Sequence, residues 1–311
     1  MSDNLIYCVQ KGEPQLIPKG SYMDMHTHIL PGIDDGSQTI GQTANMLRTA
    51  YDEGIRVIVA TPHFGIRNPG ITIAGAKEAL AEAQKKADEI TPGIKIILGS
   101  ELYYSDGIID SLERGECPTI GGTSYALVEF STRESRERIN QCIQEMVWKG
   151  YRPIIAHLER YRCLEGDIEA VRALVDRGAA VQINCRSFLD GAAAAAARAE
   201  AGSRESNVSG SRESQSASGR DKKKTLLGIF GRSEKKANRT DFFLERKGDW
   251  ARALLAEGLV HFIASDCHDD SFRSPVYRTA LEAMEGCCSE QILTDISKNN
   301  IIKLIRNERI V

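Results

Sequence analysis

Short apolar runs alternate with amphipathic stretches along most of the chain. The apolar runs are rich in Val and Ile and four to six residues long, which is typical of strands buried on both faces of a parallel sheet. The strands predicted on this basis are Tyr22–Met25, Arg56–Ala60, Lys95–Leu98, Tyr125–Phe130, Arg152–Ala156, Ala180–Asn184 and Val260–Ala264. Helical periodicity is predicted over Gly41–Glu53, Ile73–Ile90, Ser135–Lys149, Asp167–Arg177, Ser274–Glu285 and Glu290–Arg306.

The order of these elements predicts the fold class. Strands that each lead toward a helix are typical of α/β proteins with a parallel sheet. Seven such strands favour a closed or nearly closed β/α barrel. An open doubly wound sheet is the structural alternative.

Composition narrows the class of protein. The chain has 311 residues, of which 41% are hydrophobic and 27% charged, with a net charge of -3, so it is long enough for one barrel-sized domain or two small ones. It has no apolar run near the length of about 18 residues that spans a bilayer, which excludes an integral membrane protein. The near-neutral charge argues against a dedicated nucleic-acid binder. The N-terminus lacks a secretion signal, and the eight cysteines form no CxxC pair, so we expect a cytoplasmic protein with reduced thiols.

One segment departs from this pattern. From about 192 to 224, a run of alanines, Ala192–Ala197, is followed by a stretch rich in Ser, Gly and charge in which SRES occurs twice. Such a composition does not bury enough apolar surface to offset the entropy of ordering. We therefore predict a disordered insertion. A solvated linker is the simpler interpretation, and a basic docking segment is the alternative.

Histidines and carboxylates gather directly after the predicted strands. They are Asp24, His26 and His28 in DMHTH, His63 in ATPH, Glu101 in GSEL, Glu129 in VEF, His157 in AHLER, and Asp266 and His268 in SDCH. The carboxyl ends of barrel strands share one face, so these side chains are expected to converge. A lone histidine after a strand is more often a structural group, but this repeated coincidence predicts a shared metal site.

The ligand types indicate which metals suit the site. Imidazole nitrogens and carboxylate oxygens, without thiolate, suit Mn²⁺, Fe²⁺ or Zn²⁺. His26 and His28 share one side of an extended strand end, and we expect Asp266 and His268 to repeat that geometry while Cys267 faces the core. This many ligands imply two or three ions, with a carboxylate such as that of Glu101 bridging them. Clustered ions stabilise both oxygens of a phosphoryl displacement.

The ordered motif set resembles a known family. The segments DMHTHILPGIDDGS, ATPHF, GSELYY, ALVEF, AHLERY, QIN and FIASDCH are similar to those of the PHP (polymerase and histidinol phosphatase) superfamily. They resemble most closely the bacterial manganese-dependent protein-tyrosine phosphatases of capsule and exopolysaccharide loci. The resemblance covers residues 22–311 apart from the insertion, and it leaves residues 1–21 as an N-terminal extension. It implies a distorted (β/α)7 TIM-like barrel of the PHP type.

The resemblance also implies roles for individual residues. It assigns one metal to His26, His28, Glu101 and Asp266, a second to Glu101, Glu129 and His157, and a third to His63, His268 and either Asp34 or Asp35. It makes Arg160 and Arg273 phosphate binders, whose rigid forks match phosphate oxygens. A surface salt bridge is the alternative role for each arginine.

The function implied is hydrolysis of phosphotyrosine by a Mn²⁺-dependent enzyme. The implied substrate is a phosphotyrosyl protein, such as a bacterial tyrosine kinase that controls polysaccharide export. Cys163, in RYRCLEG, has no phosphate-cradling loop ahead of it, which argues against a cysteine-dependent phosphatase. A small-molecule phosphoesterase similar to histidinol phosphatase and a metal-binding regulatory module are the alternatives.

Overall fold

The computed structural model describes residues 6–8, 15–17, 21–189 and 239–311. The insertion predicted at about 192 to 224 lies outside these residues. In the described part of the predicted N-terminal extension, strands β1 (Ile6–Cys8) and β2 (Gln15–Ile17) pair antiparallel. No helix among the described residues is long and apolar enough to cross a membrane.

All seven predicted strands are present, with ends that differ from the prediction by at most two residues. They are β3 (Tyr22–Thr27), β4 (Ile55–Ala60), β6 (Lys95–Leu98), β8 (Tyr125–Glu129), β9 (Arg152–Ile155), β10 (Ala180–Asn184) and β11 (Phe262–Ala264). Two further short strands are β5 (His63–Phe64) and β7 (Glu101–Tyr103). The α-helices are α1 (Ile40–Asp52), α2 (Ile73–Ile90), α3 (Ile108–Glu113), α4 (Arg136–Trp148), α5 (Ile168–Asp176), α7 (Arg239–Ala256), α8 (Arg278–Met284), α9 (Glu290–Thr294) and α10 (Asn300–Ile305). Residues 185–189 are also helical.

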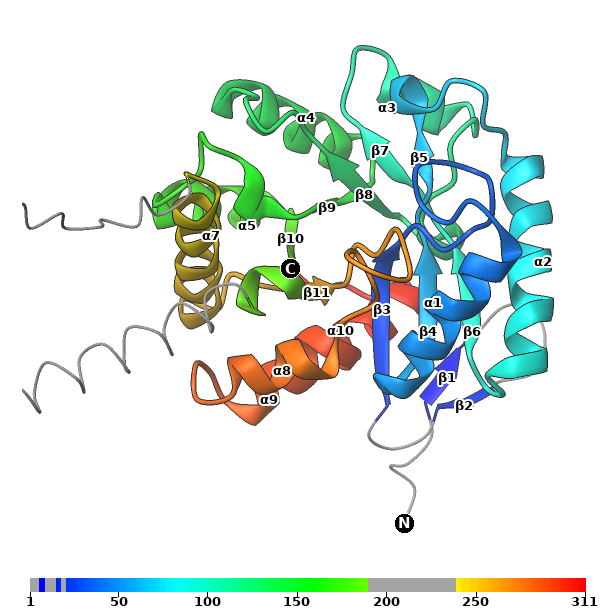
Figure 1. Ribbon diagram of the computed structural model, residues 1–311. Coiled ribbons are helices and arrows are strands. Elements are labelled where there is room, and N and C mark those ends of the chain that lie inside the picture. The colour runs from blue at the N-terminus through cyan, green and yellow to red at the C-terminus, as the bar shows by residue number, and fades with distance from the viewer. Residues whose placement is uncertain (1–5, 9–14, 18–20, 190–238) are drawn as a thin grey trace, which may run out of the picture.

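Apart from the β1-β2 pair, the strands form two parallel sheets and not the one closed sheet that a closed barrel would have (Figure 1). The smaller has the order β3-β4-β6, and the larger has the order β11-β10-β9-β8-β7-β5. The division lies where β4 gives way to β5 across Thr61 and Pro62, and where β6 gives way to β7 across Gly99 and Ser100. Proline has no N–H group to continue a ladder, so the pairing resumes only between β5 and β7. The α/β class with parallel strands is confirmed.

The two sheets nevertheless share one apolar core. A buried cluster draws on strands of both, with Met23 from β3, Val57 from β4 and Leu127 from β8, and α10 adds Ile301. A single bridge between Thr27 and Cys267 connects the end of β3 to the segment after β11. Because strands from both sheets enclose the same core, their carboxyl ends lie at the same end of the molecule.

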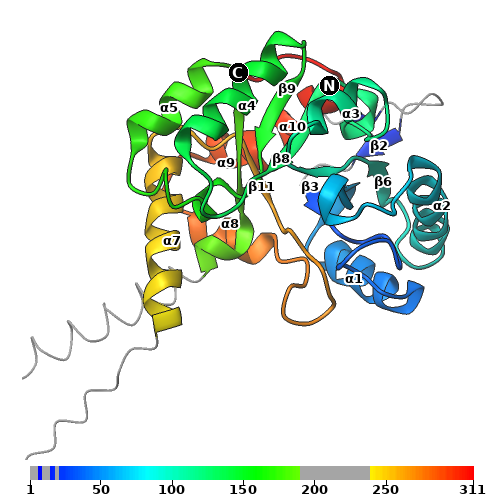
Figure 2. The same ribbon diagram turned by 90° about the horizontal axis from the view of Figure 1, so that it is seen from above.

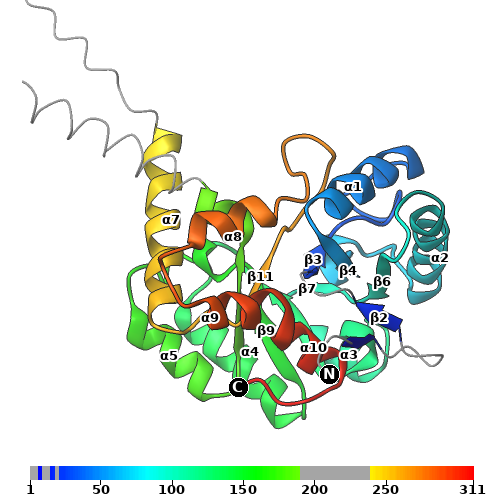
Figure 3. The same cartoon turned by 90° about the horizontal axis from the view of Figure 1, so that it is seen from below.

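Helices cover the outer faces of the sheets. Seen from above, α1 and α2 lie on one side of the molecule, and α4, α5 and α7 lie on the other (Figure 2). Seen from below, α9 and α10 lie across the end opposite the carboxyl ends of the strands (Figure 3), and α10 contacts β1. The last predicted helix is divided in two by a turn of π-helix over Asp295–Asn299.

The helix predicted over Ser274–Glu285 begins four residues later, at Arg278. The backbone N–H groups of Tyr277 and Arg278 donate to Oε2 of Glu53, at 2.9 and 2.8 Å. First-turn N–H groups of a helix have no partner inside it, so a carboxylate at the end of α1 satisfies them here. This tertiary contact therefore fixes where α8 starts.

Candidate metal centre

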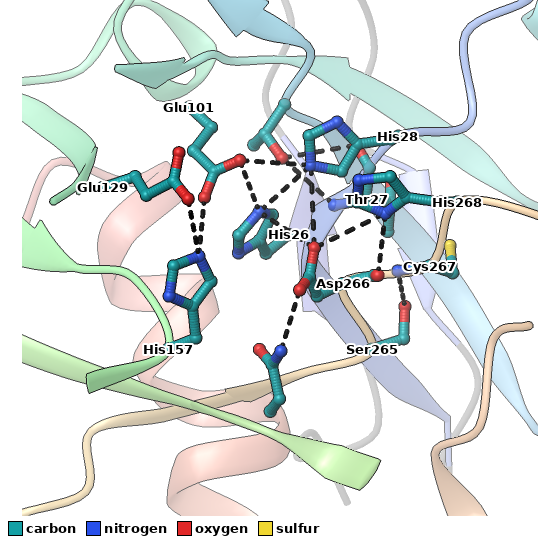
Figure 4. A network of polar contacts seen from close by, with 12 residues as sticks. His26, Thr27, His28, Glu101, Glu129, His157, Ser265, Asp266, Cys267 and His268 are labelled. Atoms are coloured by element: carbon teal, nitrogen blue, oxygen red, sulfur yellow. Dashed lines mark hydrogen bonds and ion pairs between the residues drawn. The ribbon is translucent and has the colours of Figure 1, made fainter. Parts of the chain in front are cut away.

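The candidate ligands at the strand ends converge on one buried cluster (Figure 4). Glu101, at the start of β7, lies at its centre and is 1% exposed. Its Oε2 atom lies 3.3 Å from Nε2 of both His26 and His28. The same atom lies 3.1 Å from Nδ1 of His63, and Oε1 lies 2.9 Å from Nε2 of His157. The carboxylate of Glu101 thus faces four imidazoles, which come from three separate segments of the chain.

Neighbouring acceptors orient the two imidazoles on β3. The Nε2 atoms of His26 and His28 lie 3.3 Å apart, on one side of the strand as predicted. Nδ1 of His26 lies 3.2 Å from Oε1 of Gln182, and Nδ1 of His28 lies 2.6 Å from Oδ2 of Asp34. These oxygens can accept a hydrogen bond from a protonated Nδ1, which would leave Nε2 of each ring unprotonated and able to bind a metal ion. The contacts to Gln182 and Asp34 therefore orient both imidazoles so that their Nε2 atoms face Glu101.

We expect the Gln182→Leu variant to lose about 10- to 100-fold in metal affinity, because its side chain no longer accepts from Nδ1 of His26. The backbone N–H of His157 also donates to Oε1 of Gln182, at 2.7 Å, so the same change loosens a second candidate ligand. Metal titration by calorimetry measures the effect. The Gln144→Leu variant on the exposed side of α4 serves as the control. Equal metal affinity in the two variants would contradict the orienting role.

The two neighbouring aspartates have different surroundings. Oδ2 of Asp34 contacts His28 and accepts from the backbone N–H of His63, at 3.0 Å, and its other oxygen accepts a backbone N–H within the same turn. Oδ1 of Asp35 lies 3.4 Å from Nε2 of His63 and 3.5 Å from Nε2 of His268. This geometry favours Asp35 as the ligand and Asp34 as the residue that orients His28.

The turn that carries both aspartates requires a glycine. A Cβ atom at Gly36 would lie 2.1 Å from the carbonyl oxygen of His28, a separation that only a residue without a side chain allows. The backbone N–H of Ser37 donates to that carbonyl at 3.0 Å. This close approach holds Asp34 and Asp35 against the end of β3.

An unpartnered polar atom marks the side of the cluster near Glu129. Among the described residues, Oε2 of Glu129 is buried and forms no hydrogen bond. Buried polar atoms without a partner cost free energy and call for an explanation. Glu129, His63 and Glu101 present ligand atoms within 4.8 Å of one another. A bound cation fits these atoms, because it would satisfy the unpartnered oxygen of Glu129.

Asp266 joins the cluster, but its backbone conformation differs from the predicted one. We expected Asp266 and His268 to share one side of an extended strand. Instead, β11 ends at Ala264 and Asp266 has a φ of 51°, a left-handed conformation that costs a non-glycine residue about 1 kcal/mol or more. This turn places Oδ1 of Asp266 3.6 Å from Nδ1 of His268 and from Nε2 of His26. The two side chains do meet, but through a strained turn.

The described residues form three groups that could hold ions, and these overlap the expected sets. They are His26, His28 and Glu101; His63, Glu101 and Glu129; and His28, Asp35, His63 and His268. In the second group His63 takes the place expected for His157, whose Nε2 lies 3.8 Å from Oε1 of Glu129. Glu101 belongs to two of the groups, which is the arrangement expected of a bridging carboxylate.

Burial and close contacts shift the pKa values of the groups in the cluster. Burial alone would raise the pKa of Glu101, but His26 and the other imidazoles outweigh it and lower that pKa well below its usual range. Burial and the charge of Glu101 raise the pKa of Glu129 to about 7. Burial opposes the charged form of His63, but hydrogen bonds to Asp35 and Glu101 raise its pKa to about 9. Protons and metal ions therefore compete for these groups.

The two predicted phosphate-binding arginines lie at the edge of the cluster. Nη2 of Arg160 donates to Oδ2 of Asp266 at 2.7 Å, and Nη2 of Arg273 lies 3.1 Å from the same oxygen. Their side chains are 30% and 34% exposed, and both line a pocket of about 110 Å³ beside Asp266. Both arginines thus form an ion pair with a buried candidate ligand, Asp266. Both also line the pocket, so each has further N–H donors that can face a molecule bound there.

Residue patterns did not assign roles to Gln182 and Asn184, two polar residues of β10. Nε2 of Gln182 donates to Oδ1 of Asn184 at 2.8 Å, and Nδ2 of Asn184 donates to Oδ2 of Asp266 at 2.8 Å. These contacts link His26 to Asp266 through the two side chains of β10. Polar side chains at alternate positions of an otherwise apolar buried strand were the available signal. Cys267, by contrast, packs in the apolar core as predicted.

Comparison with known proteins places this site in a family. The profile described as "Capsular polysaccharide synthesis, CpsB/CapC" matches residues 22–200. The chain is 28% identical over 292 residues to the tyrosine-protein phosphatase CpsB of Streptococcus pneumoniae, covering 93% of this chain and all of that protein. It is 27% identical over 291 residues to the tyrosine-protein phosphatase YwqE of Bacillus subtilis, covering 93% of each.

A solved structure agrees with the sequence comparison. It comes from crystal structures of YwqE of Bacillus subtilis and CpsB of Streptococcus pneumoniae, described as unique metal-dependent tyrosine phosphatases. It matches this chain with a TM-score of 0.69 and 26% identity, covering 93% of this chain and 96% of that chain. The chain belongs to the CpsB/CapC family of capsular polysaccharide synthesis proteins.

Proposed function

We propose that this protein is a metal-dependent protein-tyrosine phosphatase. The observation that carries the proposal is the position of Glu101, whose two carboxylate oxygens face four imidazoles in a buried site. The relatives named as tyrosine-protein phosphatases match nearly the whole chain. A phosphotyrosyl protein is the substrate, and a bacterial tyrosine kinase that regulates capsule or exopolysaccharide synthesis is the proposed partner.

Manganese is the proposed metal. The described ligand groups consist of imidazole nitrogens and carboxylate oxygens without a thiolate, a donor set that suits Mn²⁺ and also accommodates Fe²⁺ or Zn²⁺. Such ions, when bound, act as Lewis acids on phosphoryl oxygens and make water a stronger nucleophile at neutral pH. We assign the metal ligands to His26, His28, Asp35, His63, Glu101, Glu129, His157, Asp266 and His268, and a supporting role to Asp34.

The protein's own residues hold and orient the phosphate group. Arg160 and Arg273 present donors to the pocket beside Asp266, where they bind the substrate's phosphoryl oxygens that face away from the ligand cluster. Their positive charge stabilises the charge that builds up during phosphoryl transfer. Because guanidinium groups remain protonated at any physiological pH, they do this without competing for metal.

Cysteine chemistry does not suit this site. Among the described residues, no cysteine lines the pocket that holds Arg160 and Arg273. Cys185 and Cys267 lie closest to the site in sequence, directly after Asn184 and Asp266, and burial raises the pKa of both thiols. A protonated, buried thiol is a poor nucleophile, so the proposed mechanism forms no covalent phosphocysteine.

The proposed fold is the distorted (β/α)7 barrel of the PHP type. Two features support it: strands of both sheets enclose one core, and the bridge between Thr27 and Cys267 links the first of these strands to the segment after the last. In such a barrel the active site lies at the carboxyl ends of the strands, which is where this cluster lies.

Chelation is expected to abolish hydrolysis of a phosphotyrosyl peptide, and added Mn²⁺ is expected to restore it, because every proposed catalytic step depends on the ligand cluster. Iodoacetamide is expected to leave the rate nearly unchanged, because the thiols next to the site, those of Cys185 and Cys267, are buried and react poorly. Both treatments are followed by phosphate release under initial-rate conditions.

A parallel assay with histidinol phosphate separates the proposed function from its alternatives. Turnover of histidinol phosphate in preference to the peptide would identify a small-molecule phosphoesterase instead. Metal binding without turnover of any phosphomonoester would identify a regulatory module. Inactivation by iodoacetamide together with resistance to chelation would contradict the metal mechanism.

A further inference from the structure

The pocket beside the candidate metal centre is lined by several cationic side chains. Arg160, Arg186, Lys247 and Arg273 all line it, and Asp266 is the one carboxylate among the described residues of its lining. Oδ2 of Asp266 already forms ion pairs with both Arg160 and Arg273. Arg186 therefore favours a substrate with a negative charge in addition to the phosphate.

Arg186 differs from the other two arginines of this pocket. Within the described part of the chain it forms no ion pair, and its guanidinium carbon lies 5.1 Å from the centre of the Phe272 ring. Phe272 is 76% exposed, an unusual state for a large apolar side chain. A guanidinium group over an aromatic face keeps its edge donors free for another partner. The contact thus fixes the position of Arg186 without consuming its hydrogen-bonding capacity.

Hydrogen bonds from neighbouring elements hold the segment that carries Arg186 in place. Oε1 of Glu159, which is 3% exposed, accepts from the hydroxyl of Ser187 at 2.8 Å and from the backbone N–H of Asn184 at 3.2 Å. Nη2 of Arg252, on α7, donates to the carbonyl oxygen of Phe188 at 2.7 Å. These contacts flank Arg186 on both sides, so its backbone is held rigidly at the pocket.

We propose that Arg186, supported by Phe272, binds the carboxylate of an acidic residue next to the phosphotyrosine of the substrate. The inference rests on the proposed function and names the preferred substrate, an acidic phosphotyrosyl peptide. The edge of a guanidinium matches a carboxylate through two parallel hydrogen bonds. Arg186 is a specificity-determining residue in this scheme, and Phe272 is the positioning residue that holds its side chain at the rim.

Two matched phosphotyrosyl peptides test the proposal, one with glutamates flanking the phosphotyrosine and one with glutamines at the same positions. The manganese-loaded wild-type protein is expected to show a kcat/KM about tenfold higher for the glutamate peptide, a size typical of a charge-assisted hydrogen bond. The ratio is expected to fall to about one in Arg186→Gln. Arg186→Glu is expected to invert it, because like charges then meet.

Control variants separate a local contact from a change in overall charge. Arg172, on α5, pairs with Glu257 and does not line the pocket, so Arg172→Gln is expected to keep the wild-type ratio. Phe272→Ala is expected to lower the ratio and Phe272→Trp to retain it, because Trp preserves the aromatic face.

The outcomes that overturn the proposal are distinct from failure of the proposed function. Turnover of both peptides with the same ratio in the wild-type protein and in Arg186→Gln overturns the acidic-residue contact alone. A wild-type ratio near one has the same consequence. Turnover of a small aryl phosphate without turnover of either peptide overturns the proposed protein-tyrosine phosphatase function, and the specificity proposal falls with it.

Discussion

The Glu101→Gln variant is expected to lose metal and activity together, with kcat/KM reduced by more than about 10²-fold. Changes to residues that only support metal ligands already cost about 10- to 100-fold, and Glu101 is the carboxylate shared by two of the candidate ligand groups. The change removes one negative charge from a position that is 1% exposed, where repulsion between neighbouring cations is weakly screened. The near-equal size of the two side chains limits damage to packing.

Metal analysis of the purified variant and steady-state kinetics together measure this effect. Glu159→Gln is the matched control, because Glu159 is also buried, at 3% exposure, but belongs to none of the candidate ligand groups of the described residues. The control is expected to keep its metal content. Full metal occupancy and a near-normal rate in Glu101→Gln would remove Glu101 from the site.

The pattern of apolar residues predicted the strands well because they are buried on both faces. Strands such as Lys95–Leu98 and Ala180–Asn184 have the predicted bounds, since their ends coincide with the loss of apolar character. The division into two sheets was not predicted. It depends on two interruptions of two residues each, at Thr61 and Pro62 and at Gly99 and Ser100, which sequence periodicity does not distinguish from the end of a strand.

Some helices depend on contacts that a linear pattern does not contain. The six-residue helix Ile108–Glu113 is too short to establish a period. The start of α8 depends on Glu53, more than 200 residues earlier in the chain. Local propensity is a weak guide where a distant side chain supplies the cap.

The candidate site was largely predictable because parallel strands bring their carboxyl ends together. The histidines and carboxylates after the strands needed no contact information to be grouped. The choice between Asp34 and Asp35 as a ligand needed such information, because the two residues are adjacent in one turn and differ only in where their side chains point. Their roles separate only when the contact from Asp34 to His28 and the position of Asp35 near His63 are known.

Replacing Arg160 or Arg273 by alanine is expected to lower kcat/KM by about 10²-fold or more, because each removes a charged donor from the position of the developing charge. Arg→Lys is expected to give an intermediate loss, since it keeps the charge but not the fork. Steady-state kinetics with a phosphotyrosyl peptide and an aryl phosphate measure both effects, and Arg172→Ala on α5 is the control.

Metal content distinguishes a role in phosphate binding from a role in building the site. Both arginines contact Oδ2 of Asp266, whereas Oδ1 is the oxygen that lies 3.6 Å from Nε2 of His26 and 3.7 Å from Nε2 of His28. Removing either guanidinium leaves Oδ1 facing the cluster, and Asn184 still donates to Oδ2. Metal content and thermal stability are therefore expected to change much less than kcat/KM. Wild-type kcat/KM in either alanine variant would exclude that arginine from phosphate binding, and parallel loss of metal or fold would show that it maintains Asp266 instead.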